Sequence, residues 1–105
     1  MEFNTDINDT EKQVKIRSLK GREAQRLWNK LKEFEKLKDE GDEAIEASEK
    51  FKKYMDDLIV EYSNLNKDDL DEITVDDRVK CTDFFIEQAQ KHIIGFSTAS
   101  QKQEN

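Results

Sequence analysis

Residues 15–34, KIRSLKGREAQRLWNKLKEF, decide the fold, because an apolar stripe with helical spacing begins within them. The stripe residues advance by 3, 1, 3 and 3 positions, and at about 100° per residue they share one face of a helix. They are Ala24, Leu27, Trp28, Leu31 and Phe34. The spacing predicts a helix over about residues 20–38, with Ser18 as a candidate N-cap.

Gly21 lies where this helix starts, between Lys20 and Arg22, which raises the question of an anion site. A helix N-terminus can hold an anion. A phosphate loop, however, needs further glycines or a GK[ST] step, and neither is present around Gly21. We therefore interpret Gly21 as a helix start at which a small residue permits close packing, with anion binding as the lesser alternative.

Two further long helices are predicted, over about residues 42–64 and 75–94. Gly41 fits the end of the first helix, and the short connection makes the first two helices an antiparallel hairpin. The second helix carries an apolar face formed by Ala44, Phe51, Met55, Leu58, Ile59 and Tyr62. The last helix carries a heptad-like face formed by Val75, Val79, Thr82, Ile86, Ala89 and Ile93.

The segment between these two helices contains two N-cap patterns. Asn66 with Asp69 opens one short helical turn, and Thr74 with Asp77 opens the last helix. Gly95 is the predicted stop of that helix.

The resulting fold class is all-α, a small bundle of three long helices with a short helical turn before the last. Residues 14–96 form the single helical domain, and the alternation at residues 14–17 permits a short strand. Residues 1–13 are predicted to be a flexible N-terminus, and residues 97–105 a disordered C-terminal tail.

The charge distribution argues against nucleic-acid binding. The chain of 105 residues has a net charge of −7, and nucleic-acid binders are usually basic. Residues 11–38 hold ten Lys/Arg and four Asp/Glu, a net of +6, whereas residues 39–87 hold six Lys/Arg and seventeen Asp/Glu, a net of −11. Attraction between these segments either holds the fold together or drives assembly between copies into a homo-oligomer.

No catalytic, cofactor or metal site is expected. Cys81 and His92 are about three helical turns apart, too far for a nucleophile and its base, and a single histidine and cysteine make no zinc site. The acidic run fails as a calcium loop, because no glycine stands at its sixth position. The chain has no apolar run near the ~20 residues of a membrane span. The lone thiol and the absence of a leader pattern fit a reducing cytosol.

Four apolar residues are candidates for partner binding. Phe84 projects roughly 180°, and Val60 roughly 160°, from the apolar face of its helix. Ile94 extends the apolar character of the last helix, and Trp28 is a hot-spot candidate, although its mid-face position favours the core. The alternative is that these helices are buried on two sides.

Two segments together resemble the small tail assembly chaperones of long-tailed phages that infect Gram-positive bacteria. VKIRSLKGREAQRLW is similar to the opening of that family, on Leu19, Gly21, Arg22, Glu23 and Ala24. MDDLIVEYSNLNKDDLDEITVDDRVK resembles its second shared region, on Leu58, Ile59, Leu65, Leu70 and Val75. Lys20 departs from the Thr or Ser expected as a helix cap.

The resemblance implies a largely helical protein of the host bacterial cytoplasm that is made during infection or from a prophage. Such a protein binds the tape-measure protein, helps to recruit tail-tube subunits during virion morphogenesis, and needs no cofactor.

An alternative hypothesis comes from the acidic segment. Its net charge of −11 over residues 39–87 suits a small acidic inhibitor, either a nucleic-acid mimic or an anti-defence protein, that binds a basic protein groove. The lysines interleaved at positions 50, 52 and 53 argue against it.

Overall fold

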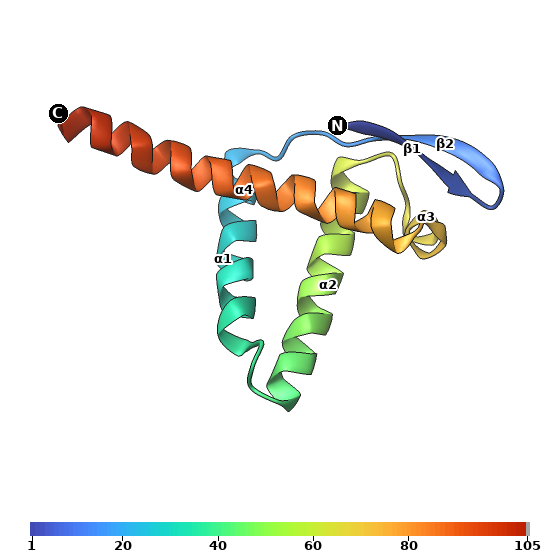
Figure 1. Cartoon of the computed structure of the whole chain (residues 1–105), viewed down its shortest axis with the longest axis horizontal. Helices are drawn as coiled ribbons and strands as arrows, with labels where there is room; N and C mark the ends of the chain where they lie inside the picture. Colours follow the sequence, from blue (N-terminus) through green and yellow to red (C-terminus); the bar gives the residue numbers. More distant parts are fainter. Residues whose placement is uncertain (105) are drawn as a thin grey trace.

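The computed structural model describes the backbone of residues 1–104 and the side chains of residues 1–95. It is mostly helical, with a small sheet at the N-terminus (Figure 1). The elements are β1 (Glu2–Ile7), β2 (Thr10–Lys15), α1 (Gly21–Leu37), α2 (Asp42–Tyr62), α3 (Lys67–Glu72) and α4 (Val75–Glu104).

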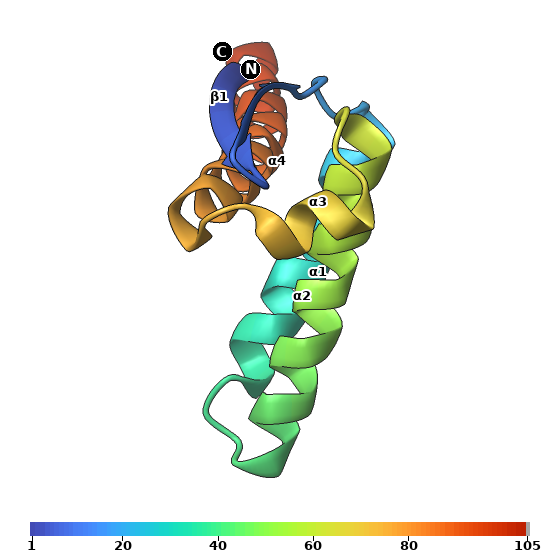
Figure 2. The same cartoon turned by 90° about the vertical axis from the view of Figure 1, so that its right-hand side faces the viewer.

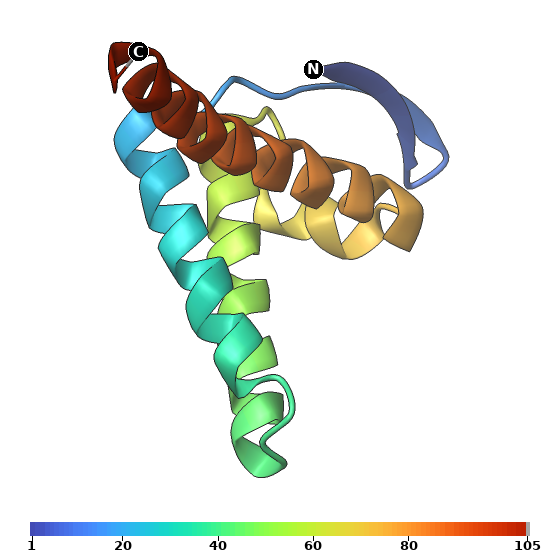
Figure 3. The same ribbon diagram turned by 60° about the vertical axis from the view of Figure 1, so that its left-hand side comes forward.

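The helices α1 and α2 form the predicted antiparallel hairpin, and α4 crosses its base. Figures 1 and 3 show α4 running over the end of the hairpin where α1 begins and α2 ends. The other end of the hairpin, with the α1–α2 loop, projects away from the rest of the chain (Figure 2). The helical order is as predicted, but α4 does not lie along the hairpin.

The N-terminal segment is a β-hairpin, which corrects the prediction that residues 1–13 are flexible and that the fold is all-α. β1 and β2 pair antiparallel, with Phe3 opposite Val14 and Ile7 opposite Thr10. Asn8 and Asp9 both have positive φ, 52° and 64°, as a two-residue type I′ turn requires. The alternation of apolar and polar residues that identifies a strand was hard to recognise in the sequence. The inward face of the β-hairpin includes the polar Thr5, and its outward face is wholly polar.

Side-chain bonds fasten this β-hairpin to the helices. Thr5 Oγ1 donates to Asp77 Oδ2 at 2.5 Å, and Lys12 Nζ donates to Asp69 Oδ2 at 2.9 Å. At the other end, the backbone N–H of Arg17 donates to the carbonyl of Tyr62 at 2.8 Å. The β-hairpin is thus joined to α3, to α4 and to the end of α2, so its marginal stability as an isolated pair of strands is offset by tertiary contacts.

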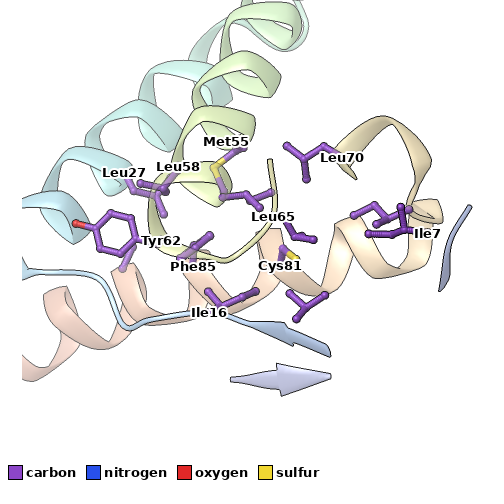
Figure 4. Packing of buried hydrophobic residues seen from close by; sticks show 14 residues of the cluster. Ile7, Ile16, Leu27, Met55, Leu58, Tyr62, Leu65, Leu70, Cys81 and Phe85 are labelled. Atoms are coloured by element: carbon purple, nitrogen blue, oxygen red, sulfur yellow. The ribbon is translucent and has the colours of Figure 1, made fainter. Parts of the chain in front are cut away.

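The core forms where α4, the base of the α1–α2 hairpin and β2 meet (Figure 4). The largest fully buried side chains in this core are Phe85, Leu27, Leu58, Ile59, Val14 and Cys81. Phe85 makes an edge contact with the ring of Tyr62 at 6.2 Å between centroids.

The buried face of α4 differs from the predicted heptad face. Val75 and Val79 are 76% and 47% exposed, whereas Cys81, Phe85 and Ala89 have no exposure. The centre of the buried set is rotated by about 80° from that of the predicted stripe, at 100° per residue, and Ala89 belongs to both. The prediction was wrong because it followed regular spacing and left out Phe85, whose large apolar area favours burial most strongly.

The helix ends are partly as predicted. Asn66 and Asp69 form a reciprocal capping box, and Thr74 Oγ1 accepts from the N–H of Asp77 at 3.2 Å. Ser18 is not a cap, because α1 follows Lys20 without a side-chain cap bond. α4 continues through Gly95 to Glu104, where a stop and a disordered tail were predicted. Position 105 of that tail lies outside the described residues.

Gly21 lies beside α4 at an ordinary contact distance. A Cβ placed on it would lie 3.4 Å from Cε1 of His92, so the structure does not require a glycine there, and its role in close packing stays a prediction. Beside it, the N–H of Leu19 donates to Oε1 of Gln88 at 2.6 Å. Gly21 and Leu19 therefore mark the contact of α4 with the start of α1.

Replacing Phe85 tests the crossing of α4. Phe85→Ala should lower the free energy of unfolding by about 3–5 kcal/mol, because it removes a fully buried aromatic ring. Val75→Ala, the matched control on the same helix, should change it by less than about 0.5 kcal/mol because Val75 is exposed. Urea denaturation measures both, and equal losses would contradict this placement of α4.

The pH dependence of stability tests the fastening of the β-hairpin. The hydrogen bond from Lys12 lowers the pKa of Asp69, and that from Thr5 lowers the pKa of Asp77. A carboxyl group whose pKa is lower in the folded than in the unfolded chain stabilises the fold at pH values above its unfolded-state pKa. This stabilisation is lost as the pH falls through the folded-state pKa. Asp69→Asn should therefore lose less stability than the parent chain between about pH 6 and pH 3.

The control for this experiment is Asp71→Asn, which changes an exposed carboxylate on the same helix. It should keep the acid sensitivity of the parent chain in urea denaturation at each pH. If both variants lose the same amount of the parent chain's acid-dependent change in stability, the ion pair between Asp69 and Lys12 is not the source of that change.

Candidate partner-binding groove

The projecting half of the α1–α2 hairpin carries a groove of about 270 Å³. We call it the hairpin groove. Its apolar floor lies between two charged rims, one from each helix. It is lined by Lys30, Glu33, Phe34, Leu37, Glu43, Glu46, Ala47, Lys50, Phe51 and Tyr54.

Two stacked aromatic rings form the floor. The centroids of Phe34 and Phe51 are 5.1 Å apart, and the rings are inclined by only 15°. Both residues remain partly exposed. The stack holds the two helices together and at the same time leaves aromatic surface in contact with water, a surface suited to an apolar partner.

The groove lies on a second face of α2. Its α2 residues Glu43, Ala47, Lys50 and Tyr54 advance by 4, 3 and 4 positions and form a stripe. This stripe is about 100° around the helix from the centre of the buried set. The buried set consists of Met55, Leu58, Ile59 and Tyr62. Because α4 crosses only the base of the hairpin, α4 does not cover this second face, which only α1 flanks.

Tyr54 closes the groove toward the base. Its hydroxyl donates to Oε1 of Glu23 on α1 at 3.2 Å. Burial raises the pKa of Tyr54, and the nearby Glu23 carboxylate raises it further. Tyr54 therefore stays a neutral hydrogen-bond donor at physiological pH. Lys30 Nζ lies 6.0 Å from the centroid of the Tyr54 ring, at the limit of a cation–π contact.

The sequence-predicted partner residues lie elsewhere. Trp28, Val60 and Phe84 are partly buried against the core cluster on three different helices, and the Nζ of Lys32 lies 4.5 Å from the Trp28 ring centroid. Ile94 is 63% exposed on α4. None of the four lines the hairpin groove, so their role in partner binding stays a prediction.

Sequence reasoning missed the groove because it assigned Phe34 and Phe51 to the core. Both residues do belong to the apolar stripes of α1 and α2, but α4 does not reach them. A signal was available in Ala47 and Tyr54, which carry apolar surface, lie seven positions apart and fall outside the predicted apolar face of this helix. Such a second stripe indicates a helix with two contact faces.

The surroundings of Cys81 are not those of a reactive thiol. Cys81 is buried, and burial raises the pKa of its thiol to about 11, so it stays protonated and unreactive. Among the described residues, no group of three or more His, Cys, Asp or Glu is placed to hold a metal ion. None of the described helices is long and apolar enough to cross a membrane.

Comparison of the chain with protein-family models, with curated proteins and with solved structures found no match. Four of the five residues that carry the second resemblance are buried, and so have a structural role: Leu58, Ile59, Leu65 and Leu70. Val75, the fifth, is exposed.

Replacing Phe51 tests whether the groove is open in solution. Phe51→Ala should lower the free energy of unfolding by about 1–2 kcal/mol, because a half-exposed ring loses its stack but leaves no closed cavity. Urea denaturation beside Phe85→Ala measures the difference. A loss as large as that of Phe85→Ala would mean that the floor of the groove is buried.

Proposed function

We propose that this protein is a tail assembly chaperone of a long-tailed phage and that it holds a helix of the tape-measure protein in the hairpin groove. The observation that carries the proposal is the uncovered aromatic floor of Phe34 and Phe51 on a hairpin that projects from a closed core. By the same proposal it acts in the host bacterial cytoplasm and helps to recruit tail-tube subunits.

The groove fits one amphipathic helix. Glu43 and Tyr54 mark its ends on α2, eleven residues or about 16 Å apart, which corresponds to three helical turns. An apolar floor with charged rims is the arrangement used to bind the apolar face of a helix. A long helical chain presents such a face repeatedly, and covering it keeps the chain from aggregating.

The use of several acidic side chains within the fold argues against the acidic inhibitor. Several carboxylates of the acidic segment are engaged within the chain: Asp56 pairs with Arg78, Asp69 with Lys12, and Asp77 accepts from Thr5. These acids serve the fold, and fewer remain free to imitate a phosphate backbone.

Co-expression with a tape-measure protein tests the proposal. The parent chain should keep the tape-measure protein soluble and elute with it on a sizing column. Phe51→Asp should reduce the complex by at least about tenfold, equivalent to ~1.4 kcal/mol, because it places a charge on the apolar floor. Ile45→Asp is the matched control, since Ile45 is 63% exposed on α2 and does not line the groove.

Three outcomes separate the alternatives. If the tape-measure protein is equally soluble alone and no complex forms, the chaperone function is wrong. If Ile45→Asp and Phe51→Asp weaken the complex equally, the groove is not the contact. If Ile94→Asp abolishes the complex and Phe51→Asp does not, the sequence-predicted surface on α4 binds the partner.

A further inference from the structure

We infer that the hairpin groove fixes the direction of the helix it binds: the partner helix runs parallel to α2, with a basic amino-terminal end at the hairpin tip. This inference rests on the proposed function, because it specifies the helix that occupies the same groove. It follows from the unequal charge of the two ends of the groove.

The tip end is acidic. Residues 39–46 contain five carboxylates and no Lys or Arg, and two of these carboxylates, Glu43 and Glu46, line the groove itself. All five side chains are exposed. A partner helix that ends here therefore meets a concentrated negative potential.

The opposite end carries less negative charge. Lys30 lies there on α1 beside Tyr54, whose hydroxyl donates to the Glu23 carboxylate. Lys50 lies about 10 Å along α2 from Glu43, near the middle of the groove. Lys50 Nζ does pair with Glu46 Oε1 at 3.1 Å, but their side chains are 76% and 67% exposed. Such a surface pair contributes little and can rearrange when a partner binds. Glu33, beside Phe34, lies at nearly the same level as Lys50, beside Phe51, so these two charges largely offset each other.

The backbone dipoles of α1 and α2 do not decide the direction. The two helices are antiparallel, so one presents its N-terminus and the other its C-terminus at the tip, and their fields largely offset each other. The side-chain charges remain. The positive amino end of a partner helix is favoured beside Glu43 and Glu46, and its negative carboxyl end beside Lys30.

The opposite orientation brings like charges together at the tip, where it places a negative helix end against the exposed carboxylates. The apolar contact with Phe34 and Phe51 is the same in either direction, so it supplies affinity without selecting direction. The rims therefore select direction, as charged rims commonly do.

Two synthetic helical peptides test the inference on the full chain. Both are stapled, are about 14 residues long, or four turns, and carry the same leucine stripe. One has two lysines in its first turn and two glutamates in its last, and the other has these charges exchanged. The lysine-first peptide should bind about 5- to 10-fold more tightly in fluorescence anisotropy, and the difference should shrink with added salt.

The direction is read separately by a spin label on the amino end of the lysine-first peptide. In the NMR spectrum of the protein, the label should broaden the backbone amide signals of residues 42–46 and leave those of residues 27–30 sharp. In the double variant Glu43→Lys/Glu46→Lys the preference between the two peptides should be largely lost, because the tip then carries two lysines beside its three remaining carboxylates. The matched control is Glu49→Lys, an exposed change on α2 outside the groove, which should leave the preference unchanged.

Equal binding of both peptides, or broadening at both ends of the groove, would overturn the inferred direction while leaving the chaperone function intact. Failure of both peptides to bind would overturn it as well. So would a dimer in sedimentation that Phe51→Asp dissociates and the peptides do not, because a second copy would then occupy the groove. The chaperone function is judged only by the tape-measure co-expression, so the two failures are distinguishable.

Discussion

The burial of Phe85 against the base of the α1–α2 hairpin is the contact on which the rest of the structure depends. It places α4 across the hairpin, and the ring of Tyr62 meets it edge-on at 6.2 Å. A crossing helix covers only a short length of its neighbours, since helices packed at steep angles touch over few turns. The closed core and the uncovered half of the hairpin are therefore two consequences of one packing arrangement.

The N-terminal β-hairpin completes this core from the side opposite the α1–α2 loop. Val14 and Ile16 contribute buried apolar surface, and the bonds of Thr5 and Lys12 to Asp77 and Asp69 place carboxylates of the acidic segment against the N-terminal strands. Part of the uneven charge of the chain is thus used for intramolecular attachment. The acidic tip of the α1–α2 hairpin lies away from these contacts, and its carboxylates remain exposed for a partner.

Helix existence, order and the α1–α2 hairpin were predictable, because they depend on local spacing and on a short connection. The capping box at Asn66 was predictable for the same reason. The β-hairpin was not, since its inward Thr5 and Lys12 interrupt the alternation that identifies a strand. The face of α4 was not either, because the exposed Val75 and Val79 share the regular spacing that normally marks a core.

By itself, then, the sequence determined which segments are helical, where the first two helices turn back, and that one half of the chain is basic and the other acidic. Periodicity, turn residues and charge are local properties of the sequence, so their effect on secondary structure does not depend on how the segments pack in the tertiary structure. Only the tertiary structure decided that Phe34 and Phe51 form an open floor instead of a core. That outcome depends on the angle at which α4 crosses, which follows from how Phe85 packs between elements far apart in the sequence.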